Sequence, residues 1–295
     1  MQTDIQQNLK QLNAMKVDFV VYPEHGRPFT ADATFREDGT HKPIVIFTHG
    51  FKGFKDWGHW NQLAHYFEDH GFVFIKFNFA YNGTSVENYA DLHDMEAFGQ
   101  NNFSLELDDM QALIDLLHDP QGPLNQKELD LNRIYMMGHS RGGGAVILKA
   151  AEEPRIKAVA TWAAVNRFDN KWEELHMEDW KRQGVQWVQN FRTGQQMPLY
   201  YQIVEDFQKN RHRLDIPKVI LNMHQPLLLL HGEEDETLPI EMAHDLKNWK
   251  QDAHLVLLPQ ADHSFGGVHP YEEEDLPPAS KAAADLTIEF FRKHA

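Results

Sequence analysis

One short segment of this chain restricts its fold more than any other. The segment is Gly138-His139-Ser140-Arg141-Gly142. It follows an apolar run at 133–137 and precedes the apolar segment 143–148, which we expect to be helical. In a strand–turn–helix unit of the pattern G-x-S-x-G, the serine takes a strained backbone conformation, and the glycines remove Cβ atoms that would clash where strand and helix approach. The Ser140 Oγ atom is therefore expected to be held out toward solvent.

The pattern G-x-S-x-G also occurs by chance, and Ser140 could then be an ordinary turn or N-cap residue. The two interpretations differ in what the rest of the chain must contain. A nucleophilic serine needs a base, and a histidine base needs a carboxylate that fixes its tautomer and stabilises the imidazolium. Both are expected downstream of the serine, in the order serine, acid, histidine.

The candidate acid lies in the turn 232–239. This turn follows the apolar run 226–231, which we expect to form a buried parallel strand. Asp235 is the acid that we choose. The other carboxylates of the turn compete with it, and any one of them could be a solvated loop charge: Glu233, Glu234 and Glu236.

The candidate base is His263, which lies just beyond the last predicted strand, 254–258. The chain has 18 histidines, so a histidine alone indicates little and its position must decide. His254 precedes the strand, and His269 lies six residues farther along the loop. His263 is therefore the predicted base, with His269 as the fallback.

With these motifs in place, the chain resembles an α/β-hydrolase of the serine esterase and peptidase type. Three segments carry the resemblance: 138–143, the turn 231–239, and Asp262-His263-Ser264-Phe265. A fourth, Thr48-His49-Gly50-Phe51-Lys52-Gly53-Phe54, follows the predicted strand 43–48 and is similar to the oxyanion loop of that family.

The chemistry expected of the fourth segment is the stabilisation of an alkoxide. Attack on a carbonyl carbon builds negative charge on oxygen, which must meet hydrogen-bond donors that are already in place. The resemblance implies that the backbone N–H groups of Phe51 and Arg141 supply them, without a role for either side chain. The alternative is that His49-Gly50 is only a strand-ending turn.

The expected architecture is a single α/β domain over 1–295 with the α/β-hydrolase fold. Alternating strands and helices imply a mostly parallel, doubly wound sheet whose first strand pair is antiparallel. The nucleophile, acid and base then follow the fifth, seventh and eighth strands, at the carboxyl edge where open α/β sheets bind ligands. The strands are expected near 16–22, 30–36, 43–48, 72–79, 132–138, 157–163, 226–231 and 254–258, and the helices near 58–70, 104–118, 142–153, 239–250 and 280–294.

The segment 166–222 is too long for an ordinary crossover between strands, so we expect a lid inserted into the domain. Its aromatic residues among many charges suit short amphipathic helices packed over a pocket. The alternative is that these aromatic side chains only join the insertion to the core. They are Trp172, Trp180, Trp187, Phe191, Tyr200, Tyr201 and Phe207.

Composition excludes several classes of function. A net charge of -16 argues against a nucleic-acid or anionic-membrane surface. No run approaches 18 apolar residues, and Met1–Asn8 lacks the features of a leader peptide, so a soluble cytoplasmic protein is expected. The absence of cysteine excludes disulfides and a cysteine nucleophile.

No cofactor and no metal are expected. Ser140 occupies the place of the second glycine of a dinucleotide fingerprint, and neither a P-loop nor an H-E-x-x-H motif occurs. His59, His65 and His70 lie on one predicted helix segment, but their spacing of five and six does not repeat on one helical face. We therefore interpret these three as surface histidines.

The leading hypothesis is hydrolysis of a small-molecule carboxylic ester through an acyl-enzyme. A serine exopeptidase or amidase is the alternative, since the motifs also resemble the catalytic domain of the prolyl oligopeptidase group, although its long N-terminal propeller is missing. A small lidded hydrolase is more similar to the feruloyl and cinnamoyl esterases. A non-catalytic binding protein on the same fold is a third possibility, disfavoured because Ser140, Asp235 and His263 are all present.

Substrate contacts are expected from two loops. Tyr81 and Asn82 follow the fourth predicted strand at its carboxyl end, and Trp57 extends the oxyanion loop. Each of the three could equally be a structural loop residue.

Overall fold

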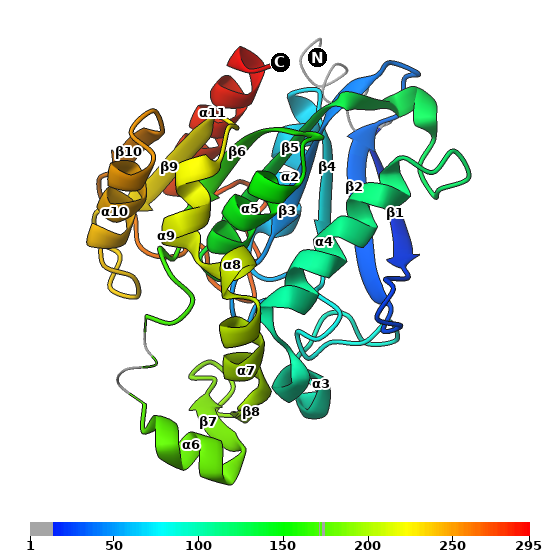
Figure 1. The fold of residues 1–295 in the computed structure, drawn as a ribbon. Helices are drawn as coiled ribbons and strands as arrows, with labels where there is room; N and C mark the ends of the chain where they lie inside the picture. The colour runs from blue at the N-terminus through cyan, green and yellow to red at the C-terminus, as the bar shows by residue number, and fades with distance from the viewer. Residues whose placement is uncertain (1–13, 171, 173–174) are drawn as a thin grey trace.

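An eight-stranded sheet in the order β1-β2-β4-β3-β5-β6-β9-β10 forms the centre of the molecule. This is a computed structural model that describes residues 14–170, 172 and 175–295 (Figure 1). The segment Met1–Asn8, which is predicted not to be a leader peptide, lies outside the described residues. The strands are β1 (Ala14–Val21), β2 (Phe29–Arg36), β3 (Lys42–Thr48), β4 (Val73–Phe77), β5 (Leu129–His139), β6 (Ile156–Trp162), β9 (Leu227–Gly232) and β10 (His254–Leu258).

The sheet is mixed but mostly parallel. β2 runs antiparallel to both of its neighbours, β1 and β4, whereas the remaining neighbours pair in parallel. This confirms the expected mostly parallel sheet with an antiparallel first pair. β3 lies beside β5 in the sheet, so the loop after β3 and the turn after β5 leave the sheet at the same edge.

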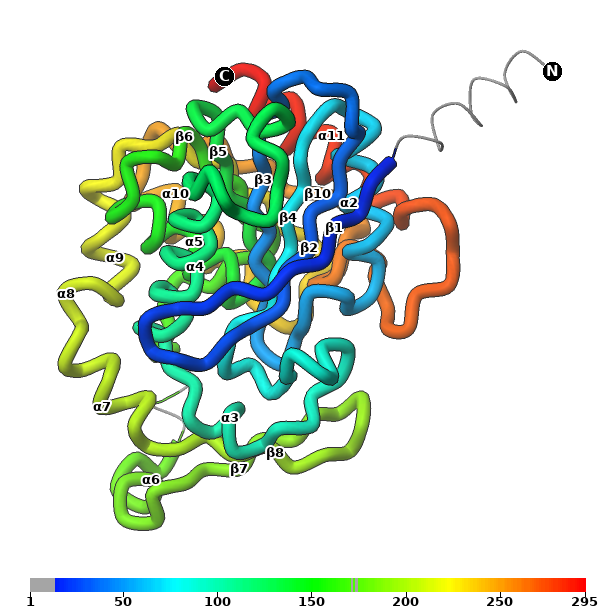
Figure 2. Tube along the Cα trace, turned by 90° about the vertical axis from the view of Figure 1, so that its right-hand side faces the viewer, coloured from blue at the N-terminus to red at the C-terminus, as the bar shows by residue number. Residues whose placement is uncertain are grey.

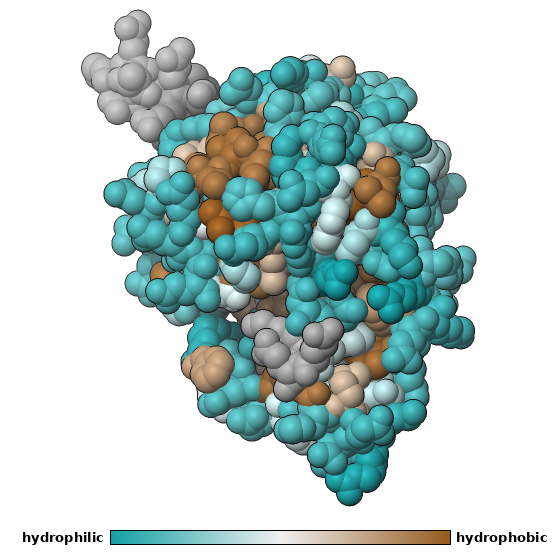
Figure 3. Space-filling model, turned by 60° about the vertical axis from the view of Figure 1, so that its left-hand side comes forward, coloured by the Kyte–Doolittle hydropathy of each residue, from teal (hydrophilic) through white to brown (hydrophobic). Residues whose placement is uncertain are grey.

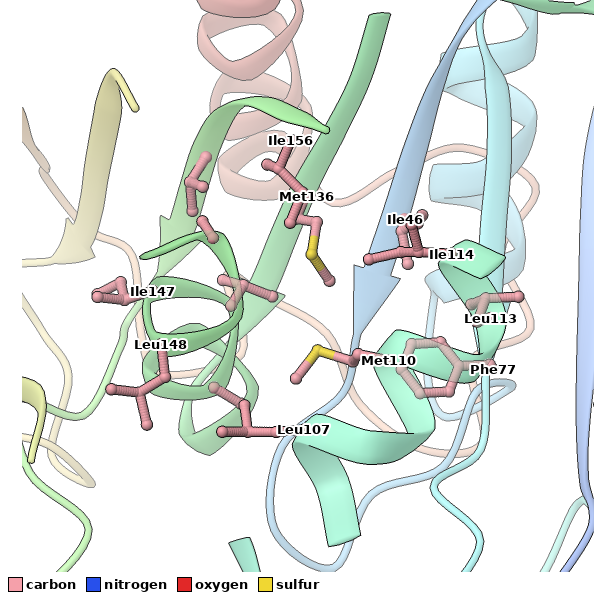
Figure 4. Close-up of a cluster of buried hydrophobic side chains, with 14 of the residues drawn as sticks. Ile46, Phe77, Leu107, Met110, Leu113, Ile114, Met136, Ile147, Leu148 and Ile156 are labelled. Atoms are coloured by element: carbon pink, nitrogen blue, oxygen red, sulfur yellow. The ribbon is translucent and has the colours of Figure 1, made fainter. Parts of the chain in front are cut away.

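Helices cover both faces of the sheet because its strands are apolar on both sides. Ile44 and Ile46 of β3 join one buried cluster, and the alternate residues Val45 and Phe47 join the other. Figure 4 shows the first cluster, in which Met110 and Met136 lie between a helix and the sheet. Its helices include α4 (Phe103–Leu117), α5 (Arg141–Glu152) and α10 (Glu241–Trp249), and those of the second are α2 (Trp60–Asp69) and α11 (Pro278–Lys293).

Between β6 and β9, the part of the insertion at 177–209 extends beyond one end of the sheet, next to α3 (Met95–Gln100), and the chain then returns beside α5 (Figures 1 and 2). The expectation of helices alone is wrong for 185–200, where β7 and β8 form an antiparallel hairpin. The β-branched and aromatic residues Val185, Trp187 and Val188, and the turn at Gly194, which has a φ of 74°, favour a hairpin over a helix. The elements are α6 (Met177–Gln183), β7 (Val185–Gln189), β8 (Gln196–Tyr200), α7 (Gln202–Lys209), α8 (Arg211–Leu214), α9 (Ile216–Val219) and the 3₁₀ turn η2 (Ile220–Asn222).

The aromatic residues of this insertion have different environments. Trp172 and Phe207 pack against Phe103 of α4, and thereby join the insertion to the core. Trp187 and Phe191 on the hairpin are exposed.

Figure 3 shows one face of the molecule, which is mostly hydrophilic. Throughout the described part of the chain, no helix has both the length and the apolar character needed to cross a bilayer.

Four charged side chains join the sheet to the loop that follows β3. Lys76 on β4 donates to Asp32 on β2 (2.8 Å) and to Asp56 in the loop (2.6 Å). Lys55 donates to the same two carboxylates, at 2.6 Å each. Lys76 and Asp32 are both 0% exposed, so neither charge has water as an alternative partner. The shared carboxylates therefore hold the loop against the sheet.

Replacing Lys76 by Met should destabilise the fold strongly. The substitution removes one partner of a buried charge network, which costs about 3–5 kcal/mol in the free energy of unfolding. Lys16 offers a matched control, because it lies 3.8 Å from the same Asp32 but is 39% exposed, and its replacement by Met should cost less than about 1 kcal/mol. Urea denaturation of both variants measures the difference; equal losses would show that burial of the network does not matter.

His59, the residue before α2, is fully buried, which corrects its interpretation as a surface histidine. Ser280 of α11 donates to the carbonyl oxygen of Phe265 (2.8 Å), so the Nε2–H group of His59 donates to Ser280 Oγ (2.7 Å). The Nδ1 atom of His59 has no hydrogen-bond partner among the described residues, and burial lowers the pKa of His59 to about 4. Of the other two histidines predicted to lie at the surface, His65 is exposed and His70 is half-buried.

The buried His59 should make stability depend on pH. An unfolded histidine binds a proton near pH 6.5, whereas folded His59 binds one only near pH 4. Between these values the unfolded state holds the extra proton, so the free energy of unfolding falls as the pH is lowered, by about 1.4 kcal/mol per pH unit. In His59→Gln the slope between pH 6 and 4.5 should be shallower by about this amount, while the exposed-site control His65→Gln should keep the wild-type slope. Denaturant titrations at several pH values test this, and an unchanged slope in His59→Gln would contradict it.

Candidate active site

Ser140 stands between β5 and α5 with φ 57° and ψ -121°, a backbone conformation that residues other than glycine rarely adopt. Two glycines make this turn possible. A Cβ atom on Gly138 would lie 2.3 Å from the carbonyl oxygen of Gly142, and one on Gly142 would lie 2.4 Å from the carbonyl oxygen of Thr48. The backbone N–H of Ser140 donates to the carbonyl oxygen of Trp162 on β6 (2.9 Å), which ties the turn to the sheet.

The structure brings Ser140, His263 and Asp235 together at the carboxyl edge of the sheet. His263 Nε2 lies 3.1 Å from Ser140 Oγ, and His263 Nδ1 lies 2.8 Å from Asp235 Oδ2. The side chain of Asp235 is 1% exposed and that of His263 is 18% exposed, so the hydrogen-bonded chain runs from the interior toward the surface. This arrangement can transfer a proton from a serine hydroxyl to an imidazole.

The surroundings of Asp235 keep its carboxylate charged. Burial alone would raise the pKa of Asp235, but hydrogen bonds from His263 and from the backbone amides of Leu238 and Thr237 outweigh it, so that the pKa lies below its usual value. The two amides donate to Oδ1 at 2.9 and 2.8 Å, which leaves Oδ2 to accept from His263. The competing carboxylates Glu233, Glu234 and Glu236 are all exposed.

His139, the residue before the serine, holds the backbone of His263. Its Nε2–H group donates to the carbonyl oxygen of His263 at 2.8 Å. Burial lowers the pKa of His139 to about 3, so the imidazole is a neutral donor at ordinary pH. Sequence reasoning missed this role, although the position of His139 at the end of β5, inside the G-x-S-x-G pattern, is a signal for it.

The loop after β3 approaches the serine closely because it contains Gly50. A Cβ atom on Gly50 would lie 3.0 Å from Ser140 Cβ and 3.2 Å from the carbonyl oxygen of His139. The loop turns tightly, since the backbone N–H of Gly53 donates to the carbonyl oxygen of Gly50 (3.1 Å). Lys52 at the tip of this turn has a φ of 58°.

Buried side chains brace the same loop. His49 Nδ1 donates to the carbonyl oxygen of Gly50 at 2.9 Å, and burial lowers the pKa of His49 to about 4. Asn82 Nδ2 donates to the carbonyl oxygen of Gly53 (3.2 Å) and lies 3.3 Å from His49 Nε2. Its Oδ1 accepts from the backbone N–H and the hydroxyl group of Thr84. The predicted substrate residue Asn82 thus uses Nδ2 to bind the loop and Oδ1 to bind Thr84 of its own segment.

A cavity of about 150 Å³ opens beside Ser140. Trp57, one of the three predicted substrate contacts, lines it, whereas the other two, Tyr81 and Asn82, are absent from the described lining. Tyr81 packs instead beneath the guanidinium of Arg27, 5.3 Å from its ring centroid. Sequence reasoning did not name Trp60 or Ser264 as lining residues. The full lining is His49, Gly50, Phe51, Lys52, Gly53, Trp57, Trp60, His139, Ser140, His263 and Ser264.

The fallback base, His269, has a different environment from His263. Its Nδ1 atom accepts a hydrogen bond from the backbone N–H of Gly58 at 2.9 Å, and its ring stacks on Trp57 with the centroids 6.0 Å apart. Burial lowers the pKa of His269. His269 therefore supports the wall of the cavity.

Comparisons with known proteins identify the family and the fold of this chain. The family described as "Serine aminopeptidase, S33" matches residues 39–215, which is more than half of the chain. A relative in Bacillus subtilis (strain 168), described as "Uncharacterized peptidase YuxL", is 29% identical over 166 residues, or 54% of this chain. The match spans only 22% of the length of that relative.

Solved structures share the fold at lower identity. The esterase domain of a Rhodothermus marinus protein covers 95% of this chain and 99% of its own, with a TM-score of 0.62 and 21% identity. Est1E from Butyrivibrio proteoclasticus covers 96% and 98%, with a TM-score of 0.62 and 19% identity. Given the family match and the shared fold, the chain belongs to the serine aminopeptidase S33 family and has the α/β-hydrolase fold.

Proposed function

We propose that the protein hydrolyses a small carboxylic ester through an acyl-enzyme, with Ser140 as nucleophile, His263 as general base and Asp235 as the carboxylate that orients it. The observation that carries this proposal is the continuous hydrogen-bonded chain from Asp235 Oδ2 through His263 to Ser140 Oγ, at 2.8 and 3.1 Å. The strained backbone of Ser140 supports it, because strain at a single exposed nucleophile is typical of such sites.

In the first half of the reaction, His263 Nε2 takes the hydroxyl proton of Ser140 as Oγ bonds to the ester carbonyl carbon. The carbonyl oxygen becomes an alkoxide, which we assign to the backbone N–H groups of Phe51 and Arg141. When the alkoxide collapses, the bond to the leaving alcohol breaks and His263 returns the proton to that alcohol. Water then repeats the sequence on the acyl group and releases the acid.

The size of the cavity favours a small acyl group. About 150 Å³ is enough for one benzene-sized ring. Trp57, Trp60 and Phe51 provide apolar surface for such a group beside Ser140. Est1E has been solved with ferulic acid bound, and a single-ring aryl acrylate is therefore a reasonable member of the substrate panel alongside short alkanoates.

The cavity also favours an ester over an N-terminal peptide. An aminopeptidase must bind the ammonium group of its substrate, for which a carboxylate is the natural partner. The described residues that line the cavity include no carboxylate, and they do include the cation of Lys52. An exopeptidase or amidase is nevertheless the second candidate, because the family description and the name of the Bacillus subtilis relative both point to peptidases.

We further propose that the insertion 166–222 is the lid of this site. Lys52 in the oxyanion loop donates to the carbonyl oxygen of Gln189 in the hairpin, at 3.0 Å. Met197 of the hairpin is buried in a small cluster with Phe54 and Phe98, against which Trp57 packs. The hairpin thus contacts the loop that forms one wall of the cavity.

Replacement of Ser140 by Ala should abolish ester hydrolysis. Removing the nucleophile is expected to lower kcat by about 10⁴-fold or more. The experiment compares wild type, Ser140→Ala and the control Ser85→Ala, whose serine lies outside the cavity lining, on p-nitrophenyl esters, an aryl acrylate ester and an aminoacyl-p-nitroanilide. Ester cleavage lost only in Ser140→Ala supports the proposal. Cleavage of the anilide alone would favour the peptidase, and inertness toward all substrates and toward a fluorophosphonate probe would favour a non-catalytic binding protein.

The p-nitrophenyl series should reveal a short acyl pocket. We expect kcat/KM to be highest between acetate and butyrate and to be at least about tenfold lower for decanoate, because the longer chain cannot be buried in the cavity. Trp57→Ala should shift the optimum to longer chains, and Trp187→Ala, at an exposed position of the hairpin, should leave it unchanged. Equal efficiency toward butyrate and decanoate in the wild type would contradict this size limit.

A further inference from the structure

The side chain of Arg141 lies between two aromatic rings that come from different parts of the fold. Its guanidinium carbon is 5.2 Å from the ring centroid of Phe51, in the loop after β3, and 4.9 Å from that of Phe103, at the start of α4. Arginine stacks well on aromatic faces because its charge is delocalised over a plane and only weakly hydrated. The guanidinium therefore connects the oxyanion loop with α4.

Glu106 of α4 fixes the guanidinium in this position. Nη2 of Arg141 donates to Oε1 of Glu106, and Nε donates to Oε2 at 3.3 Å. The two side chains are only 12% and 4% exposed. Asn101 Nδ2 adds a hydrogen bond to Oε1 of Glu106 at 2.8 Å. A guanidinium bound through two nitrogens has a fixed plane and therefore a fixed stacking geometry, whereas a lysine ammonium in its place would not.

The insertion contacts the residues that hold this guanidinium. Gln202 of α7 donates to the carbonyl oxygen of Asn101 (2.8 Å), and its Oε1 accepts from Asn102 Nδ2 (2.9 Å). Phe207 of α7 packs edge-on against Phe103, with the centroids 6.1 Å apart. Helix α7 of the insertion thus contacts Phe103, whose ring stacks on the guanidinium of Arg141. It also contacts Asn101, which binds the carboxylate of Glu106.

We propose that the Arg141 side chain is a positioning group that couples the docking of the insertion to the oxyanion hole. The inference rests on the proposed function, in which the N–H groups of Phe51 and Arg141 receive the alkoxide. With α7 docked, Phe103 and Glu106 hold the guanidinium, and the guanidinium holds the ring of Phe51. When α7 moves away, these supports weaken and the Phe51 N–H loses its fixed position.

Phe51 needs such support because its ring is partly exposed. Its side chain is among the exposed large apolar groups of the protein, and Lys52 after it lies at the tip of a tight turn. Among the described residues, the ring also lies 5.5 Å from that of Phe98 and 5.4 Å from Nζ of Lys52. Donors act on a transition state only when they are already in position, and loss of one donor costs about 10²–10³-fold in kcat. Partial misplacement should cost less.

Two variants test the coupling. Arg141→Lys keeps the positive charge and the backbone N–H but loses the planar fork, and Phe103→Leu removes one of the two rings. In each, we expect kcat for the best p-nitrophenyl ester to fall by about 10- to 100-fold with KM changed less than about twofold, because the lost interaction acts in the transition state. Affinity for a boronic acid that forms a tetrahedral adduct with Ser140 should fall in parallel with kcat/KM.

Arg155→Lys is the matched control. Arg155, in the turn before β6, also forms a forked pair with a glutamate, donating to Glu153 from Nε (2.8 Å) and Nη2 (2.6 Å), but it lies outside both the insertion and the cavity lining. This variant should lose about as much thermal stability as Arg141→Lys and keep kcat within about twofold. A fall in kcat that merely follows stability would appear in both variants.

The contribution of the insertion is measured with Gln202→Ala. We expect a smaller fall in kcat than in Arg141→Lys. The double variant should be no slower than Arg141→Lys alone, because both substitutions act on kcat through the position of Phe51. Additive effects would overturn the coupling. Values of kcat in Arg141→Lys and Phe103→Leu that match Arg155→Lys would overturn the positioning role, while loss of activity in Ser140→Ala would still uphold the proposed function. A wild type without Ser140-dependent turnover would overturn both.

Discussion

Close backbone contact between the neighbours β3 and β5 is the constraint on which the site depends. A Cβ atom on Gly142 would collide with the carbonyl oxygen of Thr48, and one on Gly50 would press against Ser140. Because β3 and β5 are adjacent in the sheet, this contact brings the end of one strand to the turn after the other. The nucleophile and the loop beside it are therefore placed by the backbone, before any polar side chain takes part.

Buried polar groups then fix the loop at its other end. Lys55 and Asp56 belong to the charge network with Asp32 and Lys76, and Asn82 ties the middle of the loop to the segment that follows β4. Such groups stabilise a fold only when every partner is present, and they impose one arrangement rather than many. The loop is thus rigid at both ends and least supported at its tip, where it meets the hairpin of the insertion.

The sequence predicted the fold and the grouping of Ser140, Asp235 and His263 because each of these features depends on where a strand ends. Strand ends follow from local apolar runs, and parallel strands bring their carboxyl ends to one edge. Tyr81 and Asn82 also follow a strand, but tertiary partners turn them away from the cavity, and no local pattern reveals those partners.

Other features were beyond local patterns for the same reason. His59 is buried because α11, more than two hundred residues later, covers it. The partner of the Arg141 side chain, Glu106, lies on another helix, and the hairpin at 185–200 was missed because its aromatic residues also suit a helix. The contacts of α7 with the start of α4 also have a consequence for the evolution of the family. An insertion that touches residues 101–103 cannot be exchanged between relatives as an independent cassette, because a new insertion would have to inherit a matching start of α4 along with it.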